Sequence, residues 1–340
     1  MQLGKKSIGS DSSDVYIIAE IGGNHNGCIK AASEMVLKAA EAGADAVKFQ
    51  SYTAETLVHR DMEAVPLARR HFRTQFERFE SLQLSGRSYE QLIEQCDDLG
   101  VDFLTTPYDF PILEKFASFM PAIKIASGDA TYHQLITAAV ETGKPVITST
   151  GFCDYAEVDK VAELVPPAQC ALMHCVSIYP LPDNQANLQA IQVMQRRFSD
   201  RVIGYSDHTV GGQACIAAAA LGARIIEKHF TLDAGQSVGD HVLSLEPIEF
   251  RQLVQSINRV AQMRGDGGKP SPGENDLRQQ LRRGVYASRT MYPGDVIEEP
   301  DLLFIRPCSE FGAEDAANLV GRKVAIRVEK GESFKSSHFE

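Results

Sequence analysis

Short apolar runs alternate with amphipathic stretches along most of the chain. Eight such runs, rich in β-branched residues, recur between Val15 and about Gly265, at residues 15–22, 45–51, 102–107, 122–128, 145–151, 170–177, 202–208 and 224–231. Each run is almost continuously apolar before it turns polar at its end, which is typical of strands buried on both faces of a covered parallel sheet. The pattern therefore predicts eight parallel strands.

The segments between these runs have helical periodicity. Residues 31–43, 89–100 and 212–222 are examples, and each is closed by the glycine that commonly follows a helix C-terminus. Eight β/α units in about 250 residues predict a closed (β/α)₈ TIM barrel of the α/β class. A doubly wound open sheet is the alternative, but no GxGxxG follows the first run, where that fold carries its dinucleotide fingerprint.

Two further regions follow the barrel. Residues 265–281 begin with GDGGKPSPGEND, a Gly- and Pro-rich stretch with the composition of a linker. Residues 282–340 contain short strand candidates separated by PGD and KGE turns, which is typical of a small β-rich module. We therefore expect a barrel at 1–264, an extended linker at 265–281 and a small β-rich domain at 282–340.

The composition narrows the possible partners. A net charge of −11 over 340 residues argues against nucleic acid or an anionic membrane surface, because both require a basic face. No apolar stretch approaches the roughly 18 residues of a membrane span, and the polar N-terminus lacks the apolar region of a signal peptide. The cysteine count is odd, at seven, without CxxC pairs, which favours buried reduced thiols. We expect a cytoplasmic protein.

Candidate chemistry lies at the ends of the eight runs. In a barrel of this type the active site forms where the C-terminal ends of the strands meet. The polar residues expected around this mouth are Glu20, Lys48, Gln50, Thr105, Thr106, Lys124, Ser127, Ser149, Thr150, Ser177, Tyr179, Ser206, Asp207, His208, Glu227, Lys228 and His229. Two lysines among several hydroxyls fit a ligand that carries a phosphate and a carboxylate, such as phosphoenolpyruvate. The alternative is that each lysine pairs with a barrel carboxylate.

Two histidines end neighbouring strands. His208 and His229 occupy corresponding positions on the seventh and eighth strands, from which two imidazoles can point toward one metal ion. A single histidine at a strand end is usually only hydrogen-bonded. Two that face one mouth favour a metal site.

Seven motifs together resemble a known family. They are AEIGGNHNG (19–27), KFQ (48–50), KIASG (124–128), TSTG (148–151), HCVSIYP (174–180), GYSDHT (204–209) and EKHFTLD (227–233). In this order they resemble the sialic acid synthase family, which includes the N-acetylneuraminate, legionaminate and pseudaminate synthases. The C-terminal region, with its PGD turn, LLFIRP and LVGRKVA, is similar to the antifreeze-like SAF domain of these enzymes.

The resemblance implies a role for each candidate residue. Phosphoenolpyruvate would be bound by Lys48, Thr106, Lys124, Ser127, Ser149, Ser177 and Ser206. The sugar would be contacted by Glu20, Gln50, Tyr179, Glu227, Asp240 and Arg306. His208 and His229 would bind a divalent metal, with Mn²⁺ expected and Mg²⁺ or Co²⁺ as alternatives, and would act in catalysis with Glu20 and Glu227. Which glutamate transfers a proton stays open.

The implied reaction is a metal-dependent transfer that forms a carbon–carbon bond. Phosphoenolpyruvate would condense with the aldehyde of an amino sugar similar to N-acetylmannosamine, giving a nonulosonic, sialic-type acid and phosphate. The resemblance also implies a domain-swapped homodimer in which Arg306 of one chain reaches the barrel mouth of the other. The alternatives are a synthase that makes another 3-deoxy-ulosonic acid from a phosphorylated sugar and, from a different class, a non-catalytic carbohydrate-binding protein.

Two segments depart from the family pattern. Residues 63–85 lack the Asn-containing sugar-binding sequence that the family carries, so the identity of the sugar stays open. The arginines of this segment are expected either to face the substrate or to form a solvated helix face; they are Arg69, Arg70, Arg73 and Arg78. In the C-terminal domain, RPCSEFG replaces the glycine-rich turn of the family after LLFI.

Overall fold

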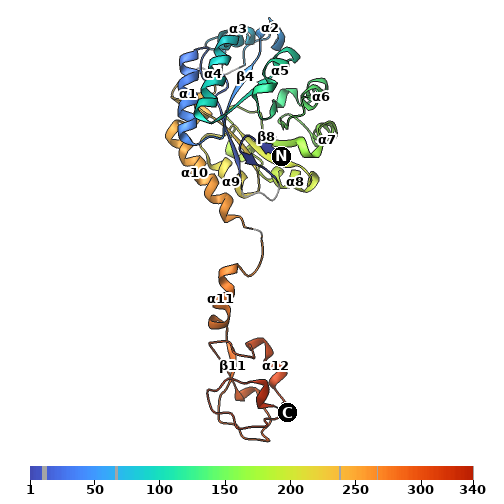
Figure 1. Ribbon diagram of the computed structural model, residues 1–340, viewed down its shortest axis with the longest axis vertical. Helices are drawn as coiled ribbons and strands as arrows, with labels where there is room; N and C mark the ends of the chain where they lie inside the picture. Colours follow the sequence, from blue (N-terminus) through green and yellow to red (C-terminus); the bar gives the residue numbers. More distant parts are fainter. Residues whose placement is uncertain (10–13, 66–67, 237–238, 266, 340) are drawn as a thin grey trace. The chain divides into compact units, whose positions relative to one another are not determined.

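Eight parallel strands form one sheet in the order β5-β4-β3-β10-β9-β8-β7-β6. Figure 1 labels two of them, β4 and β8. The eight strands are β3 (Tyr16–Glu20), β4 (Ala46–Ser51), β5 (Asp102–Pro107), β6 (Ile123–Ile125), β7 (Val146–Ser149), β8 (Cys170–Cys175), β9 (Val202–Asp207) and β10 (Ile225–His229). The structure is a computed structural model that describes residues 1–9, 14–65, 68–236, 239–265 and 267–339. Because β10 pairs with β3, the last strand returns to the first, as the predicted barrel requires.

The barrel is nearly closed. Its two end strands, β5 and β6, pack side by side, but no ladder hydrogen bond joins them in the described part of the chain. Nearly all strand residues are buried, which explains the continuous apolar runs in the sequence. The prediction of a (β/α)₈ barrel is confirmed.

Helices surround the sheet. They are α1 (Ile29–Ala42), α4 (Gly86–Leu99), α5 (Phe110–Phe116), α6 (His133–Glu141), α7 (Tyr155–Leu164), α8 (Gln189–Arg197), α9 (Gln213–Ala220) and α10 (Pro247–Met263). Two more, α2 (Ala54–Leu57) and α3 (Gln75–Leu82), lie between β4 and α4. Gly43 and Gly100 end α1 and α4 with φ angles of +92° and +68°, a left-handed conformation that glycine adopts without strain.

A short hairpin precedes the barrel. Its strands, β1 (Gln2–Leu3) and β2 (Lys6–Ser7), are too short for the sequence pattern to reveal them. Lys6 Nζ donates to Asp45 Oδ2 at 2.8 Å, and the same carboxylate oxygen accepts from the backbone N–H of Ile17 at 2.8 Å. These bonds tie the hairpin to the N-terminal ends of the first two barrel strands.

The chain divides into two compact units, Met1–Gly265 and Asp266–Glu340. The second contains α11 (Pro272–Leu281), β11 (Gly284–Ala287), β12 (Leu302–Ile305) and α12 (Ala316–Leu319). Its core consists of Val285, Ala287, Met291, Ile297, Leu319, Val324, Val328, Phe334 and Phe339. Residues 320–334 make only isolated bridges, such as Val328 with Met291, and no continuous strand.

The expected linker is only partly extended. Residues 272–281 form α11, a helix that the Gly/Pro-rich composition did not predict. The N–H of Ser271 donates to Glu274 Oε2 at 2.7 Å, half of the capping arrangement that starts a helix. Local capping thus outweighs the composition.

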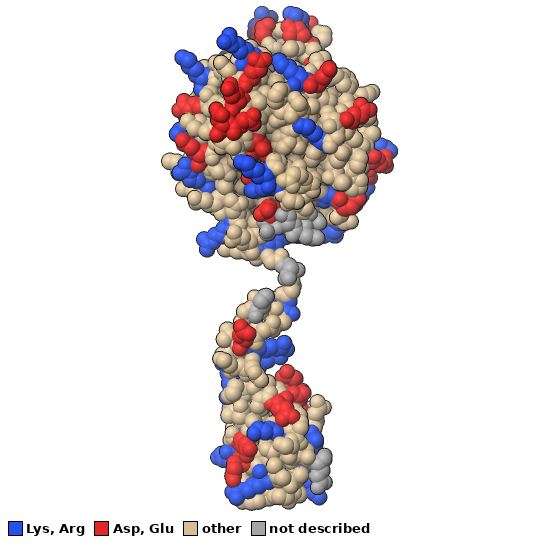
Figure 2. All heavy atoms as spheres, viewed as in Figure 1, with Lys and Arg blue, Asp and Glu red and all other residues tan. Residues whose placement is uncertain are grey.

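The surface carries both signs of charge. On the face in Figure 2, Lys and Arg side chains are interspersed with Asp and Glu over both units. Among the described residues, no helix is both long and apolar enough to cross a membrane. All seven cysteines are free, and Cys96, Cys170, Cys175 and Cys215 are buried.

Candidate active site

A cavity of about 270 Å³ lies at the C-terminal ends of the barrel strands. All predicted site residues except Asp240 and Arg306 line it; they are Glu20, Lys48, Gln50, Thr106, Lys124, Ser127, Ser149, Ser177, Tyr179, Ser206, His208, Glu227 and His229. Each barrel strand, or the loop that follows it, therefore contributes to one site, as the strand-end argument predicts.

Two buried lysines face two buried carboxylates in this cavity. Lys48 Nζ lies 2.6 Å from Glu20 Oε2 and 3.6 Å from Glu227 Oε1. Lys124 Nζ donates to Ser149 Oγ at 2.6 Å and lies 3.8 Å from Glu227 Oε2. The alternative in which the lysines pair with barrel carboxylates thus holds in this structure, and the two ammonium groups still line the cavity.

The environment shifts the pKa values of these groups in different directions. Burial raises the pKa of Glu20 even though Lys48 opposes the shift. For Glu227, burial also acts to raise the pKa, but Lys124 and Lys48 outweigh it and hold the value below normal. Burial lowers the pKa of Lys124. Of the two carboxyl groups, Glu20 is therefore the one better able to hold a proton.

Hydroxyl groups gather around Gly151, in the loop that follows β7. The N–H of Gly151 donates to Ser127 Oγ at 3.0 Å, which leaves the Ser127 proton free to point elsewhere. A Cβ atom at residue 151 would lie 2.2 Å from Ser177 Oγ and 2.8 Å from Ser127 Oγ, so only glycine fits there. Ser177 Oγ is buried without a hydrogen-bond partner among the described residues. Such an unsatisfied donor fits an anionic ligand.

Two other predicted residues connect to the charged groups. Thr106 Oγ1 accepts a long hydrogen bond of 3.5 Å from Lys48 Nζ. Ser206 Oγ donates to Glu227 Oε1 at 3.2 Å.

The two predicted metal ligands lie together. The ring centroids of His208 and His229 are 5.5 Å apart. His208 Nδ1 donates to the carbonyl oxygen of Val176 at 2.8 Å, so in the neutral ring its Nε2 carries the lone pair. His229 Nδ1 is buried and has no hydrogen-bond partner in the described part of the chain, and burial lowers the pKa of this histidine to about 3. The neutral imidazole of His229, whose Nδ1 has no hydrogen-bond partner, is therefore a suitable metal ligand.

The side chains around the two histidines show whether the protein could supply further metal ligands. No group of three or more His, Cys, Asp or Glu side chains with the geometry of a metal site occurs among the described residues. Asp240 Oδ2 lies 3.9 Å from His229 Nδ1. The histidines therefore fit an ion that takes its remaining ligands from substrate or water.

The predicted sugar-binding residues are divided between the two units. Gln50 Nε2 donates to Glu20 Oε1 at 2.9 Å. The centroid of the Tyr179 ring lies 3.9 Å from that of His208, and Asp240, which does not line the cavity, lies 3.9 Å from His229. Arg306 lies in the second unit, exposed, directly after β12.

The strand-end argument missed Tyr108, Asp129 and Cys175, which also line the cavity. Asp129 closes the short 3₁₀ helix η2 (Ser127–Asp129), directly after KIASG, and its Oδ2 atom is buried without a partner among the described residues. Burial raises the pKa of Asp129 to about 6. Only its position after that motif could have indicated it.

The same argument included residues that do not reach the cavity. Thr105 Oγ1 is hydrogen-bonded to Ser51 Oγ at 2.7 Å, and Thr150 Oγ1 donates to the carbonyl oxygen of Met173 at 2.9 Å. Asp207 and Lys228 pair with each other. Side chains alternate along a strand, so consecutive polar residues at a strand end cannot all face one side.

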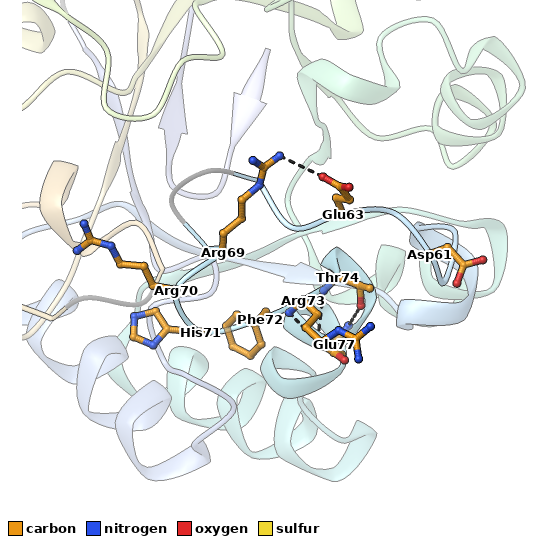
Figure 3. A pocket seen from close by; sticks show the side chains of 9 residues that line it. All are labelled: Asp61, Glu63, Arg69, Arg70, His71, Phe72, Arg73, Thr74 and Glu77. Carbon is orange, nitrogen blue, oxygen red and sulfur yellow. Dashed lines mark hydrogen bonds and ion pairs between the residues drawn. The ribbon is translucent and has the colours of Figure 1, made fainter.

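A larger hollow of about 720 Å³ lies in the loop that precedes α3 (Figure 3). Arg69, Arg70 and Arg73 line it, and Arg69 Nη2 lies 3.3 Å from Glu63 Oε2. The predicted helix face is wrong for these three arginines, because α3 begins only at Gln75 and contains Arg78 alone of the four. The lining side chains are largely exposed, unlike those of the mouth cavity, so we assign the chemistry to the mouth.

A model of the NeuB family matches residues 35–269. The chain belongs to the NeuB family. A SAF domain model matches residues 282–340, so the resemblance seen in the motifs is confirmed at both ends of the chain. The presence of a SAF domain is the feature expected to separate this family from other 3-deoxy-ulosonic acid synthases.

Relatives of the NeuB protein extend over nearly its whole length. The N,N'-diacetyllegionaminic acid synthase of Legionella pneumophila is 35% identical over 337 residues, covering 96% of this chain and 94% of that protein. The N-acetylneuraminate-9-phosphate synthase of Drosophila melanogaster is 34% identical over 349 residues, covering 94% of each.

Solved structures agree with these relatives. The N-acetylneuraminic acid synthetase of Leptospira borgpetersenii, solved with citrate, is 32% identical with a TM-score of 0.72, and the match covers 81% of this chain and 94% of that one. The protein is thus a nonulosonic acid synthase of the NeuB family, and the family implies phosphoenolpyruvate and a sugar as substrates.

Proposed function

We propose that this NeuB-family synthase condenses phosphoenolpyruvate with the aldehyde of an N-acetylated amino sugar similar to N-acetylmannosamine. The observation that carries the proposal is the mouth cavity, where Lys48 and Lys124, a cluster of hydroxyls and two histidines face the same space. C3 of phosphoenolpyruvate bonds to the aldehyde carbon. Water then adds at C2, and phosphate leaves by cleavage of the C–O bond.

The lysines and hydroxyls bind phosphoenolpyruvate in this proposal. Lys48 and Lys124 supply positive charge for the phosphate and the carboxylate. Ser127 and Ser177 donate hydrogen bonds beside Gly151, and Thr106, Ser149 and Ser206 lie within reach of the ammonium or carboxylate groups. An anionic ligand would also satisfy the buried Ser177 hydroxyl.

Glu20 holds the proton that the aldehyde oxygen receives as the carbon–carbon bond forms. Its raised pKa supports this role, although the hydrogen bond from Gln50 favours the ionised form, whereas Glu227, with its lowered pKa, stays ionised and balances the lysines. Tyr179, in the cavity, and Asp240, beside His229, contact the sugar.

His208 and His229 hold a divalent ion, with Mn²⁺ expected and Mg²⁺ or Co²⁺ as alternatives. Such an ion would supply Lewis-acid polarisation of the aldehyde. Its proposed binding is supported by the close histidine rings and the unsatisfied Nδ1 of His229.

The choice of sugar is tested by a coupled phosphate-release assay with phosphoenolpyruvate and a panel of aldehydes. The panel contains N-acetylmannosamine, its 6-phosphate and di-N-acetylated 6-deoxyhexoses. Phosphate release with the unphosphorylated N-acetylmannosamine, at the highest kcat/KM, is the expected result. Release with none of them would contradict the proposed reaction, and preference for the 6-phosphate would replace the proposed sugar.

We further propose that the active form is a homodimer in which the SAF domain of one chain covers the barrel mouth of the other and brings Arg306 to the sugar. Large apolar side chains are exposed in the loops that follow the barrel strands, including Phe152 (80% exposed) and Val210 (59%). On the second unit, Phe304 and Ile305 of β12 are exposed beside Arg306. Apolar surface of this kind favours an interface.

Complementation tests the swapped arrangement. An Arg306→Ala chain and a Lys124→Met chain, each inactive alone, are mixed and the heterodimer is isolated. Sharing of the site between chains predicts that activity returns, because one complete site forms per heterodimer. A heterodimer without activity would rule the arrangement out.

A further inference from the structure

A buried charged pair lies directly behind the histidine-bearing ends of β9 and β10. Asp207 and Lys228 are register partners on these strands, and both side chains are 0% exposed. Their chain neighbours His208 and His229 line the cavity, so the alternation of a strand turns the pair toward the helices. Consistent with this direction, Asp207 Oδ2 lies 3.4 Å from Cys215 Sγ of α9.

The ammonium group of Lys228 donates hydrogen bonds to the residues on both sides of His208. It donates to Asp207 Oδ2 at 2.7 Å and to the carbonyl oxygen of Thr209 at 2.5 Å, the residues immediately before and after His208. Lys228 itself immediately precedes His229 in the chain. A single buried cation therefore ties together the two strand ends that carry the histidines.

The carboxylate of Asp207 is held equally firmly. Its Oδ1 atom accepts from Tyr205 Oη and from the backbone N–H of Thr209, both at 2.9 Å. Its Oδ2 atom accepts from Thr209 Oγ1 at 3.1 Å in addition to Lys228. The pair is thus a directional network with several fixed bonds and little freedom to shift.

Stability alone does not call for such a pair at this place. Apolar residues of similar volume often replace a buried ion pair with no loss of stability, and the helix-facing sides of parallel strands are usually apolar. What apolar contacts do not supply is a fixed direction between the strand ends. Outer groups that orient metal-binding histidines commonly change metal affinity by about tenfold to a hundredfold when they are removed.

We propose that the Asp207–Lys228 pair is a positioning clamp, which sets the separation of His208 and His229 and the placement of Glu227 in the cavity. This inference rests on the proposed function, since it takes the histidines to hold a divalent ion. Neither clamp residue touches substrate. Both act through the residues beside them.

The test uses Co²⁺ as a probe on the full-length, metal-free chain. The double variant Asp207→Leu/Lys228→Met removes both charges and keeps the volume. It also leaves Tyr205 Oη and the Thr209 N–H without their acceptor, so thermal unfolding without metal should occur at a lower temperature, and Co²⁺ binding is measured where both proteins are folded. The Co²⁺ affinity of the double variant should fall by about tenfold or more, with a changed visible absorption spectrum. A folded double variant with the parental affinity and spectrum overturns the inference.

A matched control lies at the other end of the barrel. Lys6 and Asp45 form a less buried ion pair of similar length, at 2.8 Å compared with 2.7 Å for Lys228 and Asp207. The variant Lys6→Met/Asp45→Leu should unfold at a lower temperature and still bind Co²⁺ as the parent does. If this control binds Co²⁺ as weakly as the clamp variant does, lost stability alone explains the weaker binding, and the inference is overturned.

Two further measurements keep the clamp testable. If the double variant does not fold, Asp207→Asn keeps the shape without the charge and should still alter the Co²⁺ spectrum and affinity; an unchanged spectrum and affinity overturn the clamp. If the parent protein binds no Co²⁺, the proposed metal role fails by itself. The clamp is then judged by phosphoenolpyruvate affinity, because Glu227 contacts both cavity lysines, and an unchanged affinity in the folded double variant overturns it.

Discussion

At the N-terminal end of the barrel the half-buried carboxylates Asp45 and Asp102 have hydrogen-bond partners, whereas at the C-terminal end several polar atoms of the cavity have none among the described residues. The N-terminal end is not free of such atoms, since Arg224 Nε and Nη1 are also buried without a partner in the described part of the chain. Tyr16 Oη donates to Asp102 at 2.6 Å, and Asp45 accepts from Lys6 and from the backbone of Ile17. In the mouth cavity, Ser177 Oγ, His229 Nδ1 and Asp129 Oδ2 are buried without hydrogen-bond partners among the described residues.

The difference follows from what each end does. Paired groups at the N-terminal end contribute to stability, because each leaves no buried donor or acceptor unsatisfied. Unpaired groups at the C-terminal end cost stability in the absence of ligand, and a ligand that binds them offsets this cost. Substitutions at the two ends should therefore separate stability from activity.

The largest effect is expected at the histidines. His208→Ala should abolish metal-dependent turnover while the barrel stays folded, because the ring lies in the cavity and not in the apolar core. Turnover with added Mn²⁺ and thermal unfolding of the metal-free chain measure the two properties. Full activity of this variant in the presence of a chelator would contradict the proposed metal role of His208.

The next effect concerns the charge that meets phosphoenolpyruvate. Lys124→Met should weaken phosphoenolpyruvate binding by at least about 2 kcal/mol, since an anion loses a buried charged partner. Little stability should be lost, because Glu227 keeps Lys48 as its partner. Isothermal titration of the ligand and denaturant unfolding provide both numbers.

A lysine away from the mouth gives the control for that variant. Lys144 Nζ donates to the carbonyl oxygens of Ser118 and Met120, ahead of β6 and β7. Lys144→Met should leave phosphoenolpyruvate affinity at the parental value. If Lys124→Met also binds the ligand as the parent does, the lysine is only structural.

The opposite pattern is expected at the paired end. Asp45→Ala leaves the backbone N–H of Ile17 without its acceptor, which should lower the free energy of unfolding by about 1–3 kcal/mol. Activity per folded molecule should not change, because the substitution lies at the far end of the strands. A fall in kcat/KM without a fall in stability would contradict this division of roles.

The smallest effect depends on pH. Burial raises the pKa of Asp129 in the folded chain to about 6, from 3.8, so ionisation above that pKa penalises the folded state. Asp129→Asn should therefore increase the free energy of unfolding at pH 7.5 by about 1–2 kcal/mol, a value reduced for partial exposure of the side chain. The gain should shrink as the pH falls below 6 and disappear below 3.8, where Asp129 is protonated in both states. Denaturant unfolding of both proteins at several pH values checks the trend, and an equal gain at every pH would contradict it.

The barrel could be predicted because burial on both faces leaves an unambiguous trace in sequence. The site could be predicted only in outline. His208 and His229 were placed together by strand order alone, but the same argument included Lys228, since a strand-end list ignores the side to which each residue points. Asp129 was missed because it follows its strand in a 3₁₀ turn.

Regions without a long periodic pattern of apolar residues were the hardest to predict from the sequence. The hairpin of β1 and β2 has strands of two residues each, too few for any alternation. Helix α11 depends on capping by a few residues and not on an apolar face. The proposed role of Arg306 depends on which surface the second unit contacts, and no local sequence pattern encodes that contact.

Helix α11 stands at the start of the second unit, and the distance that it spans depends on whether it is folded. Its ten residues span about 15 Å as a helix and roughly 33 Å when extended. The side chains described along it are exposed, so tertiary packing adds little, and an isolated helix of this length is marginal in water. Melting it would more than double its span at small cost in free energy, so the reach of the chain from the barrel to the rest of the second unit is adjustable.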